Sequence, residues 1–303
     1  MANMWRWICF GGLALLLAGC ELSSPDVGAH SSGAVPSERS KWFYPAHSFK
    51  NPQAQALAQA AQDNNADEVR RLMKDEHIDP DKLFSDDGYS IPLVAWPVIT
   101  RSPVGLKAML DNGADPNARN PETHTEHDPD SSVTFYRYDN ALVFAAKTED
   151  PAYLKLLLEH GGDPDTRNID HESLLFQAFI WHNQWPNVQV LVEHGADVTA
   201  ITQGDSILTD YSERGDFKKA YWLLQHGADP KAQGKGAPGV KQRYLAVDDI
   251  FWYPAKPAFL ASQRLCQQWL LAHGIERSPM PDYYRDMRKR LGLPYEEKDI
   301  PLL

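Results

Sequence analysis

The stretch LLLEHGGDPDTRN (156–168) carries the pattern that decides the fold. Its leucines precede Gly161, and a glycine after the last helical residue is the usual left-handed stop of a helix. Pro164 follows closely, so the helix cannot restart there. Closely similar endings occur as AMLDNGADPNARN (108–120), VLVEHGADVTAIT (190–202) and WLLQHGADPKAQ (222–233). The recurrence of this ending indicates a repeated structural unit.

Each ending closes a unit of two short helices. In the best-formed copy, Asn140 is placed to cap the first helix, over 141–146. Leu154, Leu157 and Leu158 occur at i, i+3 and i+4, so they share one face of the second helix. That apolar face is too small to form a core alone and must be covered by the next copy. The sequence therefore predicts an all-α repeat solenoid of about 5–6 helix-turn-helix units.

The unit resembles the ankyrin repeat, whose Gly-Ala-Asp-Pro ending is matched closely at 113–117, 161–164, 195–198 and 227–230. Degenerate first and last copies occur at 56–83 and 267–276, and we assign 51–278 to an ankyrin-repeat domain. The resemblance implies a stack with short hairpin fingers that binds another protein and is not an enzyme. The unit starts, such as SIPLVAW (90–96), keep little of the family's Thr-Pro-Leu-His pattern. We therefore expect looser stacking than in a regular array.

Two copies are longer than the family's period of about 33 residues. The interval is 34 residues from Gly161 to Gly195 and 32 from Gly195 to Gly227, but 48 from Gly113 to Gly161 and 47 from Gly227 to Gly274. The first insertion (121–138) is acidic with aromatic residues near its end, and the second (231–243) is basic. Two interpretations remain open: solvated loops, which cost little entropy, or fingers that contact a partner.

The candidate partner contacts lie on or beside these insertions and on the neighbouring finger. They are Arg119, His124, His127, Phe135, Tyr136, Tyr138, Arg167, His171, Lys235, Lys241 and Arg243. Aromatic and arginine side chains on loops commonly dominate the energy of protein interfaces. Trp181 and Trp185 flank a turn between two helices, where we expect them to cover the side of the stack.

The sequence does not favour a metal site, a cofactor-binding site or a catalytic site. His124 and His127 lack the helical spacing and the third ligand of a zinc site. GKGAPGVK (234–241) lacks the Lys-Ser/Thr pair of a phosphate loop. The sequence contains no recognisable hydrolase motif and no paired carboxylates in a glycosidase frame. The formal net charge of -11 argues against a nucleic-acid partner.

The N-terminus has the features of an exported lipoprotein. An apolar run at 8–19 is too short to cross a bilayer and has the length of a signal-peptide core. Leu17-Ala18-Gly19-Cys20 resembles the lipobox of bacterial lipoproteins, which implies acylation of Cys20, and Glu21 implies sorting to the outer membrane. Residues 1–19 are then the signal peptide, and 20–50 form a lipidated, flexible tether. The folded part is expected to face the periplasm.

The C-terminal segment (279–303) is predicted to form a helix and tail that cap the last repeat. The apolar face of this helix is expected to comprise Tyr283, Tyr284, Met287 and Leu291. Cys266 lies at helical spacing with apolar residues of the last copy, so we expect a buried core thiol.

The layout of the chain resembles that of ankyrin-type lipoproteins that act as immunity proteins and neutralise antibacterial phospholipase effectors delivered into the periplasm by type VI secretion. This resemblance implies a secreted effector as the protein partner and a membrane anchor through the N-terminal lipid. A general envelope scaffold, for example in stress defence, is the alternative, and an enzyme with a site on the fingers is a third. An immunity role predicts one tight partner encoded next door and toxicity on deletion, whereas a scaffold predicts neither.

Overall fold

Helices follow one another in pairs along the chain. The computed structural model describes residues 44–120, 138–233 and 245–303. In these ranges the pairs are α2 (Pro52–Gln62) with α3 (Ala66–Arg70), α4 (Trp96–Ile99) with α5 (Pro103–Asp111), α6 (Ala141–Ala146) with α7 (Pro151–Glu159), α8 (Leu174–Ile180) with α9 (Trp185–Glu193), α10 (Ile207–Ser212) with α11 (Phe217–Gln225), and α12 (Ala246–Trp252) with α13 (Leu260–Ala272). The number of pairs agrees with the predicted number of units.

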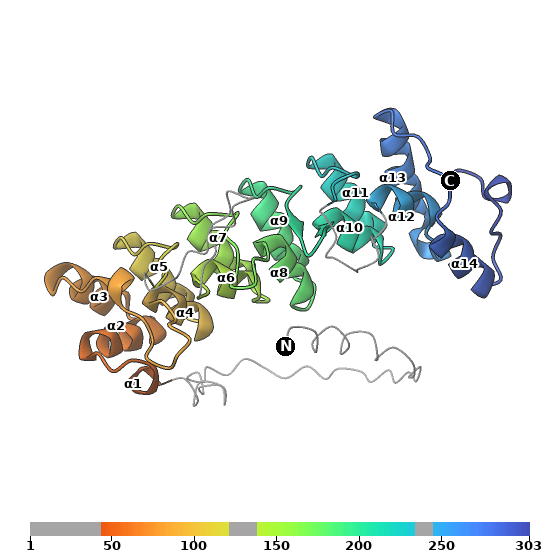
Figure 1. The fold of residues 1–303 in the computed structure, drawn as a ribbon. Helices are drawn as coiled ribbons and strands as arrows, with labels where there is room; N and C mark the ends of the chain where they lie inside the picture. Colours follow the sequence, from red (N-terminus) through yellow and green to blue (C-terminus); the bar gives the residue numbers. More distant parts are fainter. Residues whose placement is uncertain (1–43, 121–137, 234–244) are drawn as a thin grey trace, which may run out of the picture. The chain divides into compact units, whose positions relative to one another are not determined.

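Corresponding helices of successive pairs lie side by side and form two layers (Figure 1). The first helices contact one another in order from α2 to α12, and the second helices do so from α3 to α9 and from α11 to α13. Trp185 of α9 meets Trp222 of α11 edge to face, with 5.3 Å between ring centroids. Leucine and alanine side chains fill the space between the layers. The predicted all-α repeat solenoid is confirmed.

The remaining elements are short. They are α1 (Pro45–Ser48), α14 (Asp282–Arg290), a π-helical turn (Arg71–Asp75), 3₁₀ turns at Pro80–Lys82, Leu93–Ala95, Pro257–Phe259 and Glu297–Asp299, and the antiparallel strands β1 (Ile201–Thr202) and β2 (Asp205–Ser206). Within the ranges that the structure describes, no helix has the length and apolar content needed to cross a bilayer. The predicted signal peptide and Cys20 lie outside the described residues.

Every second helix ends in the same left-handed turn. Gly113, Gly161, Gly195, Gly227 and Gly274 have φ values between 71° and 100°. The following amide bonds back into the helix, as Gly162 N does to Leu157 O at 2.9 Å. In the degenerate first copy His77 adopts the left-handed conformation, with φ of 59°, and Ile78 N donates to Leu72 O at 3.1 Å. The π-helical turn before it accommodates one extra residue, so this copy closes as the others do.

The aspartate of each ending folds the next residues back on themselves. Its Oδ1 accepts the amide two residues later, at 2.8–3.1 Å, in Asp79, Asp115, Asp163, Asp197 and Asp229. This is the local side-chain turn that aspartate favours. We name the turns at 77–81, 113–117, 161–165, 195–199 and 227–231 the turn row. The recurring sequence is therefore a recurring hydrogen-bonded turn as well as a helix stop.

The first four turns of the row are bonded to each other in succession. Asp81 Oδ1 accepts from Asp115 N at 2.9 Å, and Asp165 Oδ1 accepts from Asp197 N at 2.7 Å. Between them, Asn117 Oδ1 accepts from Asp163 N at 2.8 Å, although an insertion separates these two copies in sequence. The looser stacking that we expected is therefore not found along this part of the turn row.

The folded part begins before residue 51. Residues 44–50, which we assigned to the flexible tether, contain α1 and bury Pro45 and Phe49. Phe49 packs edge to face on Trp96 of α4, with 5.3 Å between ring centroids. The stretch YPAHSFK (44–50) has no regular apolar spacing, so the burial of Phe49 could not be anticipated from the local sequence.

The C-terminal helix forms as predicted, but with a different buried face. α14 buries Tyr284 and Arg288, Met287 is half-buried, and Tyr283 is exposed. Leu291 is also exposed because the helix ends before it and Gly292 turns the chain at φ of 67°. Arg288 takes a buried position because its Nε donates to Trp252 O at 3.0 Å, a contact that hydrophobic periodicity does not reveal.

Candidate functional site

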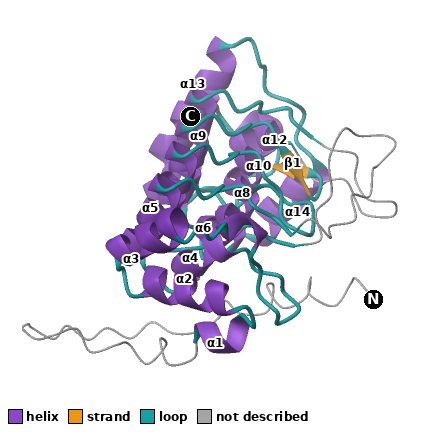
Figure 2. Cartoon of the chain, turned by 90° about the vertical axis from the view of Figure 1, so that its left-hand side faces the viewer, coloured by secondary structure: helices purple, strands orange, loops and turns teal. Residues whose placement is uncertain are grey.

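In the ranges that the structure describes, hairpin fingers connect the first, third and fourth turns of the row to the next helix pair. The described fingers are the first (84–92), the third (167–173) and the fourth (201–206), closed by the pairs Phe84 with Pro92, Arg167 with Ser173, and β1 with β2. The connections after the second and fifth turns, numbered here as the second and fifth fingers, contain 121–137 and 234–244, which lie outside the described residues. Figure 2 shows the loops between helix pairs leaving the helices on the side where β1 lies.

The tips of the described fingers expose large side chains. Tyr89 of the first finger is 74% exposed, and Ile169 of the third is 46% exposed. The backbone beside them turns through left-handed residues, Gly88 and Ser90 in the first finger and His171 in the third. The tips therefore present apolar surface to solvent from tightly turned loops.

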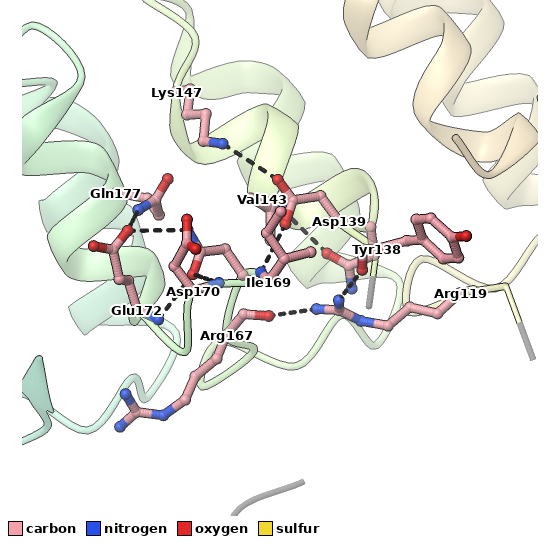
Figure 3. Close-up of polar contacts among 12 residues, drawn as sticks. Arg119, Tyr138, Asp139, Val143, Lys147, Arg167, Ile169, Asp170, Glu172 and Gln177 are labelled. Atoms are coloured by element: carbon pink, nitrogen blue, oxygen red, sulfur yellow. Dashed lines mark hydrogen bonds and ion pairs between the residues drawn. The ribbon is translucent and has the colours of Figure 1, made fainter. Parts of the chain in front are cut away.

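Two arginines connect the bases of successive fingers (Figure 3). Arg119 Nη2 donates to Arg167 O at 2.6 Å, and its Nη1 donates to Tyr138 O. Arg167 Nη1 donates to His171 O at 2.7 Å within its own finger and to Ile201 O at 3.3 Å in the next. Both arginines stand six residues after the glycine of their turn. Each one joins its copy to the carbonyl at the same position of the following copy.

A carboxylate bonds the base of the second finger to the tip of the third. Asp139 Oδ1 accepts from Ile169 N at 3.1 Å, and Asp139 Oδ2 pairs with Lys147 Nζ at 3.4 Å (Figure 3). Lys147 also lies 5.3 Å from the ring centroid of Trp181, which is half-exposed. The exposed tip of the third finger is thus held to Asp139 of the second finger through the backbone amide of Ile169.

A buried carboxylate holds the third and fourth fingers together. Glu172 accepts hydrogen bonds from Asn168 Nδ2 at 3.0 Å, from Gln177 Nε2 at 2.5 Å and from Gln203 Nε2. Thr202 of the fourth finger adds a hydroxyl that accepts from Ser173 N at 3.1 Å. Amide and hydroxyl partners satisfy polar groups that would otherwise be costly to bury.

The structure brings together four of the residues predicted to contact a partner. Arg119, Tyr138, Arg167 and His171 lie on the second and third fingers, and His171 is exposed. The bonds of both arginines to backbone carbonyls are a structural role that we did not predict. Cys20, His124, His127, Phe135, Tyr136, Lys235, Lys241 and Arg243 lie outside the described residues.

Sequence reasoning missed the acidic residues of this face. Asp139 and Glu172 each stand immediately before the residue that caps a first helix, and Asp205 holds the same position in the next copy. An acidic residue before the cap in three successive copies is a signal that could have identified them.

The described residues contain no group of three or more His, Cys, Asp or Glu side chains placed to hold a metal ion. Cys266 is fully buried, as predicted, and its Sγ donates to Phe217 O at 3.3 Å. Burial raises the pKa of this thiol to about 12, so it stays protonated at neutral pH. Neither observation adds a reactive centre to the finger face.

Replacing Arg119 tests whether its guanidinium links the fingers. Arg119→Ala removes two hydrogen bonds and is expected to lower the free energy of unfolding by about 1–3 kcal/mol. Arg119→Lys is expected to recover little of the loss, because an ammonium group cannot span both carbonyls as the planar fork does. Urea unfolding followed by circular dichroism measures both, with exposed Lys155→Ala as the control. Stability equal to wild type in Arg119→Ala would contradict the linking role.

Comparison with known proteins finds matches to this chain among solved structures. No family model and no curated protein sequence matches it. The ankyrin repeat domain of Bcl-3, described as a unique member of the IkappaB protein family, is similar with a TM-score of 0.52 and 22% identity, over 73% of this chain and 86% of that one. EF0377, an ankyrin repeat protein, is similar with a TM-score of 0.51 and 19% identity, over 71% of this chain and 98% of that one. The chain therefore has the ankyrin-repeat fold.

Proposed function

We propose that the chain binds another protein along its fingers. The observation that carries the proposal is that the bases of the second, third and fourth fingers are bonded to one another, and Asn120 Nδ2 donates to Ser90 Oγ of the first finger at 2.8 Å, while the tips expose Tyr89 and Ile169. Exposed loops on a rigid scaffold are where recognition residues usually occur. Apolar and aromatic side chains there contribute most when a partner covers them completely. The proposed activity is binding without turnover of a substrate.

The more specific proposal is a lipid-anchored immunity protein of the periplasm. Its support is the lipobox-like sequence ending at Cys20 and the flexible composition of the residues after it. A tether of about 20 residues would give a reach of about 25 Å from the outer membrane. The nature of the partner, a phospholipase-type effector, is supported only by resemblance to ankyrin-type immunity lipoproteins. An inhibitor of this kind needs a broad, rigid surface, and the interlinked fingers supply a suitable one.

Removing both finger tips tests the binding face. The double variant Tyr89→Ala, Ile169→Ala is expected to weaken binding at least tenfold, since interface anchors contribute more than about 1 kcal/mol each. Titration calorimetry with the purified product of the adjacent gene measures the dissociation constant. Thermal unfolding should be unchanged, because both side chains are exposed.

Val104→Ala is the matched control for the tip variants. Val104 is also exposed, but it lies at the start of α5 and outside the fingers. Undiminished binding by the double variant, or an equal loss with Val104→Ala, would contradict the proposed face.

Deleting the gene distinguishes the immunity role from the scaffold role. Cells that carry the adjacent effector gene are expected to lose viability without this chain and to recover it with the wild-type protein. Cys20→Ala should lose incorporation of radiolabelled palmitate if the lipobox assignment is correct. Normal growth of the deletion strain while the effector is expressed would exclude immunity and favour a scaffold.

A further inference from the structure

Asp249 of α12 is buried where three helices meet. Its side chain joins α12 to α10 and to α14, and only 2% of the residue is exposed. Ser212 Oγ of α10 donates to Asp249 Oδ2 at 2.8 Å, and Tyr284 Oη of α14 donates to Asp249 Oδ1. Both partners are neutral hydroxyl groups. A carboxylate placed in this way has donors for its oxygens but no opposite charge among these partners.

The charged groups that face Asp249 are themselves acidic. Asp248 precedes it on α12 and accepts from Ser278 Oγ at 2.5 Å, and Glu213 follows α10. Burial is the main cause that raises the pKa of Asp249 to about 7, and Glu213 and Asp248 add to the rise. Hydrogen bonds from Tyr284 and Ser212 oppose it. Burial and the same carboxylate raise the pKa of Tyr284, so its hydroxyl remains a donor near neutral pH.

Two arginines of this region, Arg277 and Arg288, are bonded to the backbone, and Arg285 of α14 pairs with Glu296 and Glu297. Arg288 of α14 donates to Trp252 O at 3.0 Å and to Pro294 O at 3.3 Å. Arg277 donates to Ile300 O at 2.7 Å and lies over the ring of Trp252, 3.8 Å from its centroid. These cations hold the C-terminal segment to α12 through carbonyl groups and an aromatic face. Asp249 keeps hydroxyl groups as its partners.

The attachment of α14 depends on few side chains. Tyr284 and Arg288 are its two buried residues, and the hydroxyl group of Tyr284 donates its hydrogen bond to Asp249. If α14 leaves α12, water reaches this carboxyl group and its pKa returns to the ordinary value near 3.9. The docked form therefore holds the proton more tightly than the released form does.

We propose that Asp249 is a proton-dependent latch that fastens the C-terminal helix α14 to the last repeat. Protonated Asp249 is compatible with the closed position, whereas ionisation places an unpaired charge under α14. The latch is tightest in acid and loosens as the carboxyl group ionises. It would change the exposure of the last repeat's edge, at Trp252 and Asp249, without altering the turn row.

The direction of the pH dependence follows from linkage. The docked pKa lies above the released one, so docking is strongest below about pH 4 and weakens as the pH rises towards 7. With values of about 3.9 released and about 7 docked, the docking equilibrium falls about 50-fold between pH 5 and 7. From pH 7 to 8 it falls only about twofold further, because both forms are then ionised.

Hydrogen exchange of the full chain at pH 5, 6, 7 and 8 tests the latch. Protection factors for 282–290, corrected for the intrinsic rate at each pH, are expected to fall about 50-fold from pH 5 to 7. Peptides from α13 (Leu260–Ala272) serve as the internal reference and should stay constant. Asp249→Asn should abolish the dependence, whereas Asp286→Asn, an exposed residue of the same helix, should keep it.

Tyr284→Phe keeps the test decisive if Asp249→Asn does not fold. It removes a hydrogen bond that favours ionised Asp249, so the midpoint of the wild-type pH dependence should move to higher pH. A wild-type protection factor for α14 that is flat between pH 5 and 7 would overturn the latch. An unchanged dependence in Asp249→Asn or an unmoved midpoint in Tyr284→Phe would do so too.

Discussion

The hydrogen bonds between successive turns are the constraint on which the rest of the structure depends. Each turn uses an aspartate to fold its own backbone, and in the first three turns a second side chain accepts a hydrogen bond from an amide of the next copy. Asn117 makes two hydrogen bonds to the next turn: its side chain accepts from Asp163 N at 2.8 Å and donates to Gly161 O at 2.9 Å. The apolar layers drive the stacking, but they can slide, whereas these directional bonds fix the register.

A fixed register has a direct consequence for the fingers. The arginines and acidic residues at the finger bases reach neighbouring copies only because the turns hold those copies at a constant offset. Arg119 and Arg167 make the same step to the next copy from the same position in the repeat. The tips are consequently held in fixed relation to each other while remaining exposed. A surface of this kind loses little conformational entropy when a partner binds.

The features that could be predicted from the sequence are those set by short-range chemistry. The glycine stops, the cap at Asn140 and the helix pairs follow from local rules and are present. His77 in a left-handed turn was not predictable, because an extra residue in a π-helical turn changes the local register. Arg119 was predicted as a site residue, but the backbone carbonyl groups that accept its hydrogen bonds could not be identified from the sequence.

The contacts that form the proton latch at Asp249 could not be predicted from the sequence either. Ser212 and Tyr284 are far from Asp249 in sequence, and only the packing of α10, α12 and α14 brings them to one carboxyl group. The latch acts at the C-terminal end, where α14 takes the place of a further repeat. Its operation and the binding of a partner by the fingers are independent proposals.

Hydrogen exchange in Asn117→Ala tests most directly whether the turns hold the repeats in register. Losing both bonds to the next turn should lower the opening free energy of 161–165 by about 1–2 kcal/mol and speed its exchange about 5–30-fold. Lys107→Ala, which removes an exposed ion pair on α5, should leave that exchange unchanged. Exchange at 161–165 that is identical in Asn117→Ala and wild type would contradict the account.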